Sequence, residues 1–274
     1  MKKRIVVKLG TSILTQSRGV KNSVLQALVG EICALKRNGA EFILVTSGAI
    51  GAGMKELGWS KRPTDMNKKQ AAAAVGQVSL MHIYQQLFIK HHVKVAQVLL
   101  SRGDFNDRRR YVNAQSTLKT LLKLGVVPVI NENDTVSIEE IQFGDNDRLS
   151  ALVSVKMHAD LLIILSDVEG LYGSLSTRDL IPLVAKITPK IEKLAGKGSD
   201  SGFGTGGMAS KILAAKIATA SGAAVVVANG SRKHVLQDII EDKSVGTRFV
   251  SKKSLSAKER WRLSSSLLKS WKSV

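Results

Sequence analysis

Short apolar runs and amphipathic runs alternate along the chain. The apolar runs are about five residues long and rich in Val, Ile and Leu, which is typical of strands buried on both faces of a parallel sheet. Between them, apolar residues recur three or four positions apart, as in Asn22–Arg37, where Gly39 follows as a stop. This alternation predicts an α/β fold with an open, mainly parallel central sheet sandwiched by helices.

The expected strands cover Arg4–Lys8, Glu41–Val45, Val93–Leu99, Val126–Ile130, Leu161–Leu165 and Ala223–Val227. The expected helices cover Asn22–Arg37, Met66–Ile89, Arg108–Lys123, Leu149–Val155 and Met208–Ala220. Pro128 lacks a backbone N–H donor, which predicts a bulge or an edge position for its strand. Val136–Phe143 is more polar and predicts a hairpin or flap outside the main sheet.

Composition limits the classes of protein to which the chain can belong. No apolar run approaches the roughly 18 residues needed to span a bilayer, and Met1–Arg4 leads into a run too short for a signal peptide. The single cysteine, Cys33, excludes an internal disulfide and fits a reducing compartment. We therefore expect a cytoplasmic protein with no membrane contact. Residues 1–274 show no linker and no repeat, so we expect one domain with a weak division near 155–170.

The formal net charge of +19 is spread over the whole chain. The densest late stretch, 251–274, carries Trp261 and Trp271 but no interleaved aromatic stripe, so it is weak evidence for nucleic-acid binding. Such a charge would attract polyanions and raise their encounter rate.

A glycine cluster that ends in a lysine, Gly202–Lys211, is the most informative motif. Its glycines allow backbone N–H groups to turn toward one point and cradle an anion. The helix expected over Met208–Ala220 directs its positive N-terminal end to the same point, and Lys211 in its first turn is unfavourable there without an anionic ligand. The cluster predicts a nucleoside triphosphate site. The cluster fits neither the P-loop nor the dinucleotide-binding context. The alternative is a flexible loop, because glycine clusters often serve only as loops.

Polar residues follow four of the expected strands. These stretches are Lys8–Ser12, Thr46–Gly53, Asn131–Asp134 and Ser166-Asp167. Ligands of open α/β sheets collect outside the carboxyl ends of the strands, so we expect a site at this edge. Lys8 and Lys211 together would stabilise a transferring phosphate. The alternative for Lys8 taken alone is a strand-end lysine that reaches solvent.

Acidic and amide side chains supply the rest of the expected site. Gly144–Asp147 precedes a helix, where an acid either caps the helix or separates the two lysines. Asn131–Asp134 forms either a turn that needs no ligand or a binding group for an ammonium or amide of a small substrate. Ser47-Gly48-Ala49 would hold a carboxylate with its hydroxyl and N–H groups at a helix start.

With these residues in view, the chain resembles the glutamate 5-kinases of the amino-acid kinase family from Lys8 to about Trp261. The motifs that carry the resemblance are V-K-L-G-T-S, V-T-S-G-A-I-G-A-G, I-N-E-N-D, F-G-D-N-D and G-T-G-G-M-A-S-K. The resemblance implies ATP-dependent phosphorylation of the γ-carboxylate of L-glutamate, with Mg²⁺ carried by ATP rather than held by the protein. It also implies a glutamate-binding lobe over about 1–155 and an ATP-binding lobe over about 156–274.

The resemblance also assigns residues. Those implied for glutamate are Ser47, Gly48, Ala49, Asp134 and Asn146. Those implied for ATP are Lys8, Gly10, Ser166, Asp167, Thr205, Gly206, Gly207, Met208 and Lys211. Lys8 and Lys211 would also act on the transition state, and Asp147 would orient both lysines.

Partners follow from the same resemblance: a homo-oligomer, proline as a feedback inhibitor, and a glutamyl-phosphate reductase that takes the product. Many members carry a further C-terminal domain of the PUA type, which we do not expect before Val274. Two alternatives remain open at this point. One is a nucleoside monophosphate or carbamate kinase with the same fold, and the other is a basic RNA-binding or regulatory protein that retains the fold.

Overall fold

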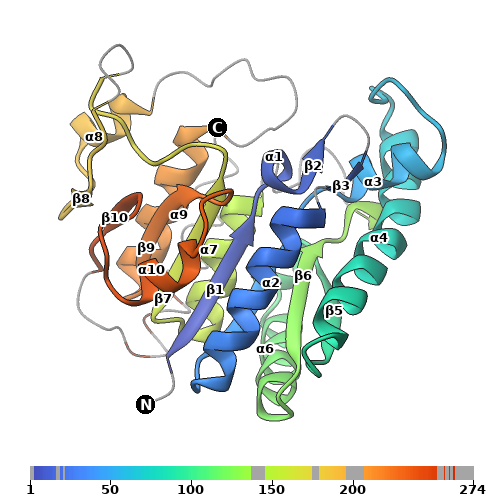
Figure 1. The fold of residues 1–274 in the computed structure, drawn as a ribbon, viewed down its shortest axis with the longest axis horizontal. Coiled ribbons are helices and arrows are strands. Elements are labelled where there is room, and N and C mark those ends of the chain that lie inside the picture. The colour runs from blue at the N-terminus through green and yellow to red at the C-terminus, as the bar shows by residue number, and fades with distance from the viewer. Residues whose placement is uncertain are drawn as a thin grey trace.

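The computed structural model describes residues 3–16, 19–20, 22–136, 146–174, 179–195 and 207–251, together with residues 256, 259 and 262. Among them, eight strands form one sheet in the order β5-β6-β4-β1-β7-β9-β10-β8 (Figure 1). The strands are β1 (Arg4–Leu9), β4 (Glu41–Val45), β5 (Val95–Leu100), β6 (Val127–Glu132), β7 (Leu161–Ser166), β8 (Leu183–Val184), β9 (Ala224–Asn229) and β10 (Thr247–Phe249). All neighbours are parallel except β9 and β10, so the expected open, mainly parallel sheet is confirmed.

Helices cover both faces of the sheet (Figure 1). The longer helices are α2 (Asn22–Arg37), α4 (Met66–Ile89), α6 (Arg108–Lys123), α7 (Asn146–Met157) and α9 (Met208–Ala220). The shorter elements are α1 (Thr11–Leu14), α3 (Ala49–Glu56), α5 (Gly103–Asn106), η1 (Asp134–Val136), α8 (Pro189–Leu194) and α10 (Val235–Ile240), with a small hairpin of β2 (Thr15–Gln16) and β3 (Gly19–Val20). No helix in the described ranges is both long and apolar enough to cross a lipid bilayer.

The alternation of side chains along β1 decides which residue reaches which layer. Ile5, Val7 and Leu9 join the core under α1, α2, α4 and α10, whereas Val6 joins the core under α5, α6, α7 and α9. Because successive side chains of a strand point to opposite faces, Lys8 lies on the same side as Val6. Lys8 therefore points toward α7 and α9, at the carboxyl end of a central strand.

The prediction for Pro128 was wrong. It lies in β6, which has β5 on one side and β4 on the other, and its strand is neither bulged nor at the edge. Val127 N donates to Lys94 O on the β5 side, so the ring nitrogen of Pro128 faces the β4 side. Pairing with β4 begins only at Leu44↔Val129. The N–H group that Pro128 lacks would therefore lie just before the first residue of β6 that pairs with β4. Its absence removes no hydrogen bond between these two strands.

The helix expected over Leu149–Val155 begins three residues earlier, at Asn146. Its first two residues are Asn146 and Asp147, so the positive end of α7 faces these side chains. The hairpin expected over Val136–Phe143 lies almost entirely outside the described residues. The short strands β8 and β10 were not predicted, because two or three residues carry no measurable period.

Candidate active site

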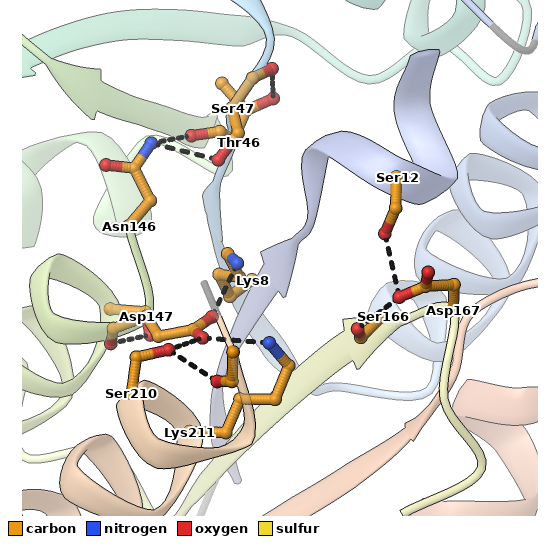
Figure 2. A network of polar contacts seen from close by, with 12 residues as sticks. Lys8, Ser12, Thr46, Ser47, Asn146, Asp147, Ser166, Asp167, Ser210 and Lys211 are labelled. Carbon is orange, nitrogen blue, oxygen red and sulfur yellow. Dashed lines mark hydrogen bonds and ion pairs between the residues drawn. The ribbon is translucent and has the colours of Figure 1, made fainter. Parts of the chain in front are cut away.

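Asp147 forms ion pairs with two buried lysines (Figure 2). Its Oδ1 lies 2.5 Å from Lys8 Nζ, and its Oδ2 lies 3.2 Å from Lys211 Nζ. Asp147 is fully buried, and the lysines are 4% and 3% exposed. Lys8 and Lys211, which lie far apart in the chain, thus meet at one carboxylate. This acid is the one expected to offset the repulsion between the two amines.

Three elements position this group. Lys8 comes from β1, Asp147 from the first turn of α7, and Lys211 from the first turn of α9. Two buried ammonium groups share one buried carboxylate. Buried charges need counter-charges, so an anionic ligand beside the two lysines would add to the negative charge that Asp147 supplies.

Ser210 joins the same carboxylate, and sequence reasoning missed it. Its hydroxyl lies 2.9 Å from Asp147 Oδ2 and 2.8 Å from the carbonyl oxygen of Gly207, the N-cap residue of α9 (Figure 2). The hydroxyl has one proton and two acceptors. Ser210 therefore links the end of the glycine cluster to the carboxylate that holds both lysines. A serine in a first helical turn is so common that its sequence position gave no signal.

A second acid lies on the other side of Lys8. Asp167 Oδ1 accepts hydrogen bonds from Ser166 Oγ at 2.9 Å and from Ser12 Oγ at 3.1 Å (Figure 2). Burial raises the pKa of Asp167, but these hydrogen bonds and the nearby charge of Lys211 outweigh burial and hold the pKa below its usual value. Asp167 is thus an anion at neutral pH that ties the end of β7 to α1.

Gly10 keeps the space above Lys8 open. Its N–H donates to Leu165 O at 3.0 Å, which fixes the turn after β1 against β7. A Cβ at this position would lie 3.0 Å from Leu165 O and 3.7 Å from Lys8 Nζ. A larger residue would therefore press on the carbonyl and stand beside the amine.

Asn146 connects α7 to the end of β4. Its Nδ2 donates to the carbonyl oxygen of Thr46, to Ser47 Oγ at 3.1 Å and to Asn131 Oδ1 at 2.8 Å. Gly48 follows with a φ of 94°, in the left-handed region that favours glycine, and Ala49 begins α3. The residues Ser47, Gly48, Ala49 and Asn146 therefore meet at one corner of the site, next to the start of a helix.

Asp134 lies in η1, beyond the end of β6, and is partly buried. Burial raises its pKa to about 6, although the charge of Arg62 opposes that rise. The carboxylate thus titrates near neutral pH. Of the other predicted residues, Gly207 and Met208 lie at the start of α9, whereas Thr205 and Gly206 lie outside the described residues.

Comparisons with known proteins show the family to which the chain is related. The profile of the amino acid kinase family matches residues 3–229. The chain is 45% identical over 265 residues to glutamate 5-kinase of Burkholderia vietnamiensis, which covers 94% of this chain and 71% of that protein. It is 48% identical over 253 residues to glutamate 5-kinase of Pelobacter propionicus, which covers 90% of this chain and 68% of that protein.

Two solved structures share the fold at 17% identity. Carbamate kinase from Giardia lamblia bound to AMP-PNP has a TM-score of 0.66 and covers 92% of this chain and 99% of its own. The product complex of isopentenyl phosphate kinase from T. acidophilum has a TM-score of 0.62 and covers 90% and 100%. At this identity the likeness concerns the fold alone.

Proposed function

The chain belongs to the amino acid kinase family, and from this membership and the geometry of its site we infer how it carries out its reaction. The reaction is ATP-dependent phosphorylation of the γ-carboxylate of L-glutamate, which gives L-glutamyl 5-phosphate in the first step of proline biosynthesis. The single observation that supports our assignment of residues is the contact of the Asp147 carboxylate with both Lys8 and Lys211.

The reaction requires neutralisation of the negative charge on both substrates rather than a general base. A glutamate side chain has a reference pKa of about 4.3, so the nucleophile is already ionised at neutral pH. One oxygen of this carboxylate bonds to the γ-phosphorus of ATP, the bond from that phosphorus to the β,γ-bridging oxygen breaks, and ADP leaves with the electron pair. The obstacle is the repulsion between two anions that must approach in line.

Lys8 and Lys211 reduce that repulsion. Both amines bind the phosphate oxygens of ATP and stabilise the charge that spreads over the transferring group. Asp147 holds the two amines close together before ATP arrives, so little reorganisation is needed during the reaction. The ATP-binding residues are Lys8, Gly10, Ser166, Asp167, Thr205, Gly206, Gly207, Met208 and Lys211.

Glutamate binds at the corner formed by the ends of β4 and β6. The start of α3, at Ser47, Gly48 and Ala49, receives the α-carboxylate, because a helix N-terminus favours an anion and the Ser47 hydroxyl, whose oxygen accepts from Asn146 Nδ2, can donate its proton to one. Asp134 and Asn146 hold the α-ammonium group. The side-chain carboxylate then extends toward Lys8, between the glutamate-binding lobe of about 1–155 and the ATP-binding lobe of about 156–274.

Mg²⁺ enters with ATP. The described residues contain no group of three His, Cys, Asp or Glu side chains placed to hold a metal ion, and Asp147 already contacts two lysines and Ser210. These residues fit a metal borne by the nucleotide better than one held by the protein. The bound metal supplies further neutralisation of phosphate charge.

Membership of the family supports further proposals about partners and location. We propose a homo-oligomer in the cytoplasm, feedback inhibition by proline, and consumption of the product by a glutamyl-phosphate reductase. The product is a mixed anhydride, so a reductase that acts on it promptly limits its loss to water.

A hydroxamate assay tests the assignment. Purified protein with ATP, Mg²⁺, hydroxylamine and L-glutamate should yield glutamyl hydroxamate. Aspartate should yield none, and neither carbamate nor a nucleoside monophosphate should stimulate release of ADP. Turnover with one of these acceptors but not with glutamate would overturn the proposed substrate site.

A further inference from the structure

We propose that Gln77, in the middle of α4, is a positioning residue that orients Asn146 for glutamate and acts through Asn131. The inference rests on the proposed function, in which Asn146 contacts the substrate. Gln77 lies outside the motifs named in the sequence analysis, and it is only 8% exposed.

Hydrogen bonds fix the direction of three amides in a row. The carbonyl oxygen of Thr46 can only accept, so the Asn146 atom that faces it is the donor Nδ2. The same Nδ2 donates to Asn131 Oδ1 at 2.8 Å. Asn131 must then turn its Nδ2 the other way, where it donates to Gln77 Oε1 at 2.8 Å. The row thus has one consistent direction, with the Thr46 carbonyl as the acceptor at one end and Gln77 Oε1 as the acceptor at the other.

The far end of this row is unusual. Gln77 Nε2 is buried and has no hydrogen-bond partner in the part of the chain that the structure describes. A buried donor without an acceptor is unfavourable, and an apolar side chain that served only for packing would avoid it. The feature that Gln77 provides and an apolar residue could not is the acceptor Oε1 for Asn131.

Gln77 also stands on a rigid support. Its neighbour Gly76 packs so tightly on α3 that a Cβ there would lie 1.9 Å from Ala49 O and 2.2 Å from Gly53 N. Ala49 is the first residue of α3, directly after the Ser47-Gly48 corner. The contact therefore holds Gln77 at a fixed place relative to the corner where glutamate binds.

The consequence is a defined polarity at Asn146. Its Nδ2 is committed to protein oxygens, and its Oδ1 points away from Thr46 and Ser47 (Figure 2). Oδ1 is therefore the atom that meets the substrate, and an acceptor suits an ammonium group. Without Gln77, Asn131 loses the acceptor that fixes its orientation. Its amide can then rotate and present a donor to Asn146, which would turn a donor toward the ammonium.

The test compares Gln77→Leu with wild type in steady-state kinetics for both substrates. We expect the KM for glutamate to rise about tenfold, as for the loss of one ordered hydrogen bond, with the KM for ATP and kcat within about twofold. Gln85→Leu, an exposed glutamine of the same helix, is the matched control and should change neither KM. If Gln77→Leu does not fold, Gln77→Met, which fills a similar volume, replaces it.

A double-mutant cycle with Asn131→Ala identifies the route of the effect. If Gln77 acts through Asn131, the double variant should have the KM of Asn131→Ala alone. Additive effects, an unchanged KM for glutamate, or equal changes in both KM values would overturn the inference. Asn146→Ala separates this failure from that of the proposed function: if that variant too leaves the KM for glutamate unchanged, the substrate site itself is wrongly assigned.

Discussion

The two ends of α7 bury lysine amines in opposite ways. At the N-terminal end, Lys8 and Lys211 share the carboxylate of Asp147. At the C-terminal end, Lys156 is fully buried, and its Nζ lies 4.3 Å from the ring centre of Tyr111 and 4.7 Å from that of Phe105. Among the described residues, this amine has no hydrogen-bond partner.

The difference shows what a counter-charge does for a buried lysine. Burial lowers the pKa of Lys156 to about 8, although the charge of Asp104 opposes that shift. Aromatic faces attract a cation only weakly compared with a carboxylate. The site end of the helix therefore holds two amines on one carboxylate, whereas the amine at the far end lies against two aromatic rings.

Removing the counter-charge should have the largest effect. Asp147→Asn keeps the shape of the side chain but leaves two buried ammonium groups without their acid. We expect kcat to fall about a thousandfold, as when a preorganised electrostatic group is removed. Asp104→Asn, near the other end of α7, is the control and should keep kcat within about threefold. Near-normal turnover by Asp147→Asn would contradict the role given to Asp147.

Removing the lone amine should stabilise the protein. Lys156→Met keeps the length of the side chain and avoids a buried charge. A folded pKa of about 8 against an ordinary 10.5 corresponds to a penalty on the order of 3 kcal/mol while the amine is charged.

Because the pKa of Lys156 is lower in the folded protein than in the unfolded chain, the stability gained by Lys156→Met depends on pH. Below pH 8 the folded protein must charge the amine, so the penalty is complete. Between pH 8 and about 10.5 the folded amine is neutral, and the penalty fades. Urea unfolding of wild type and Lys156→Met should show the largest gap at pH 7 and almost none at pH 10.5. A gap that does not change with pH would show that packing, not charge, causes it.

The site also contains an acid whose pKa is shifted upward. With a pKa of about 6, Asp134 becomes protonated below pH 6 and then attracts an ammonium group less. The KM for glutamate should rise up to tenfold per pH unit below 6, because the ionised fraction falls tenfold per unit. Asp134→Asn should have a high KM at every pH. A wild-type KM that is flat between pH 5 and 7 would argue against contact with the substrate.

The smallest effect is expected at Ser210. Ser210→Ala removes one hydrogen bond to Asp147 but leaves both ion pairs, so kcat should fall about threefold to tenfold. Ser221→Ala is a matched control at the other end of α9, where the hydroxyl donates to the Ala218 carbonyl at 2.8 Å. Equal losses in the two variants would assign Ser210 to helix stability alone.

The central strands and both lysines could be predicted from the sequence, and the reasons are local. Strands such as Leu161–Ser166 are continuous apolar runs, and Lys8 follows a similar run directly. An acid from the turn Gly144–Asp147 was expected to ease the repulsion between two amines that bind one ligand, and the resemblance to the family gave this role to Asp147. The roles of these residues in catalysis stay predictions until the variants are measured.

What the sequence did not predict depends on distant contacts. Ser210 and Gln77 acquire their partners only when α9 meets α7 and α4 meets β6, 63 and 54 residues apart in the chain. The burial of Lys156 requires Phe105 and Tyr111 to fold over it. The position of Pro128 required the starting point of the β4 pairing, which no local pattern encodes.

Lys8 and Lys211 come from the first strand and from a helix that ends at residue 220. A chain still being synthesised at the ribosome carries Lys8 from the start but cannot complete the pair until α9 has emerged. On the roles proposed for the two lysines, such an unfinished chain lacks half of the phosphate-binding pair, so we expect it neither to transfer nor to hydrolyse the γ-phosphate of ATP.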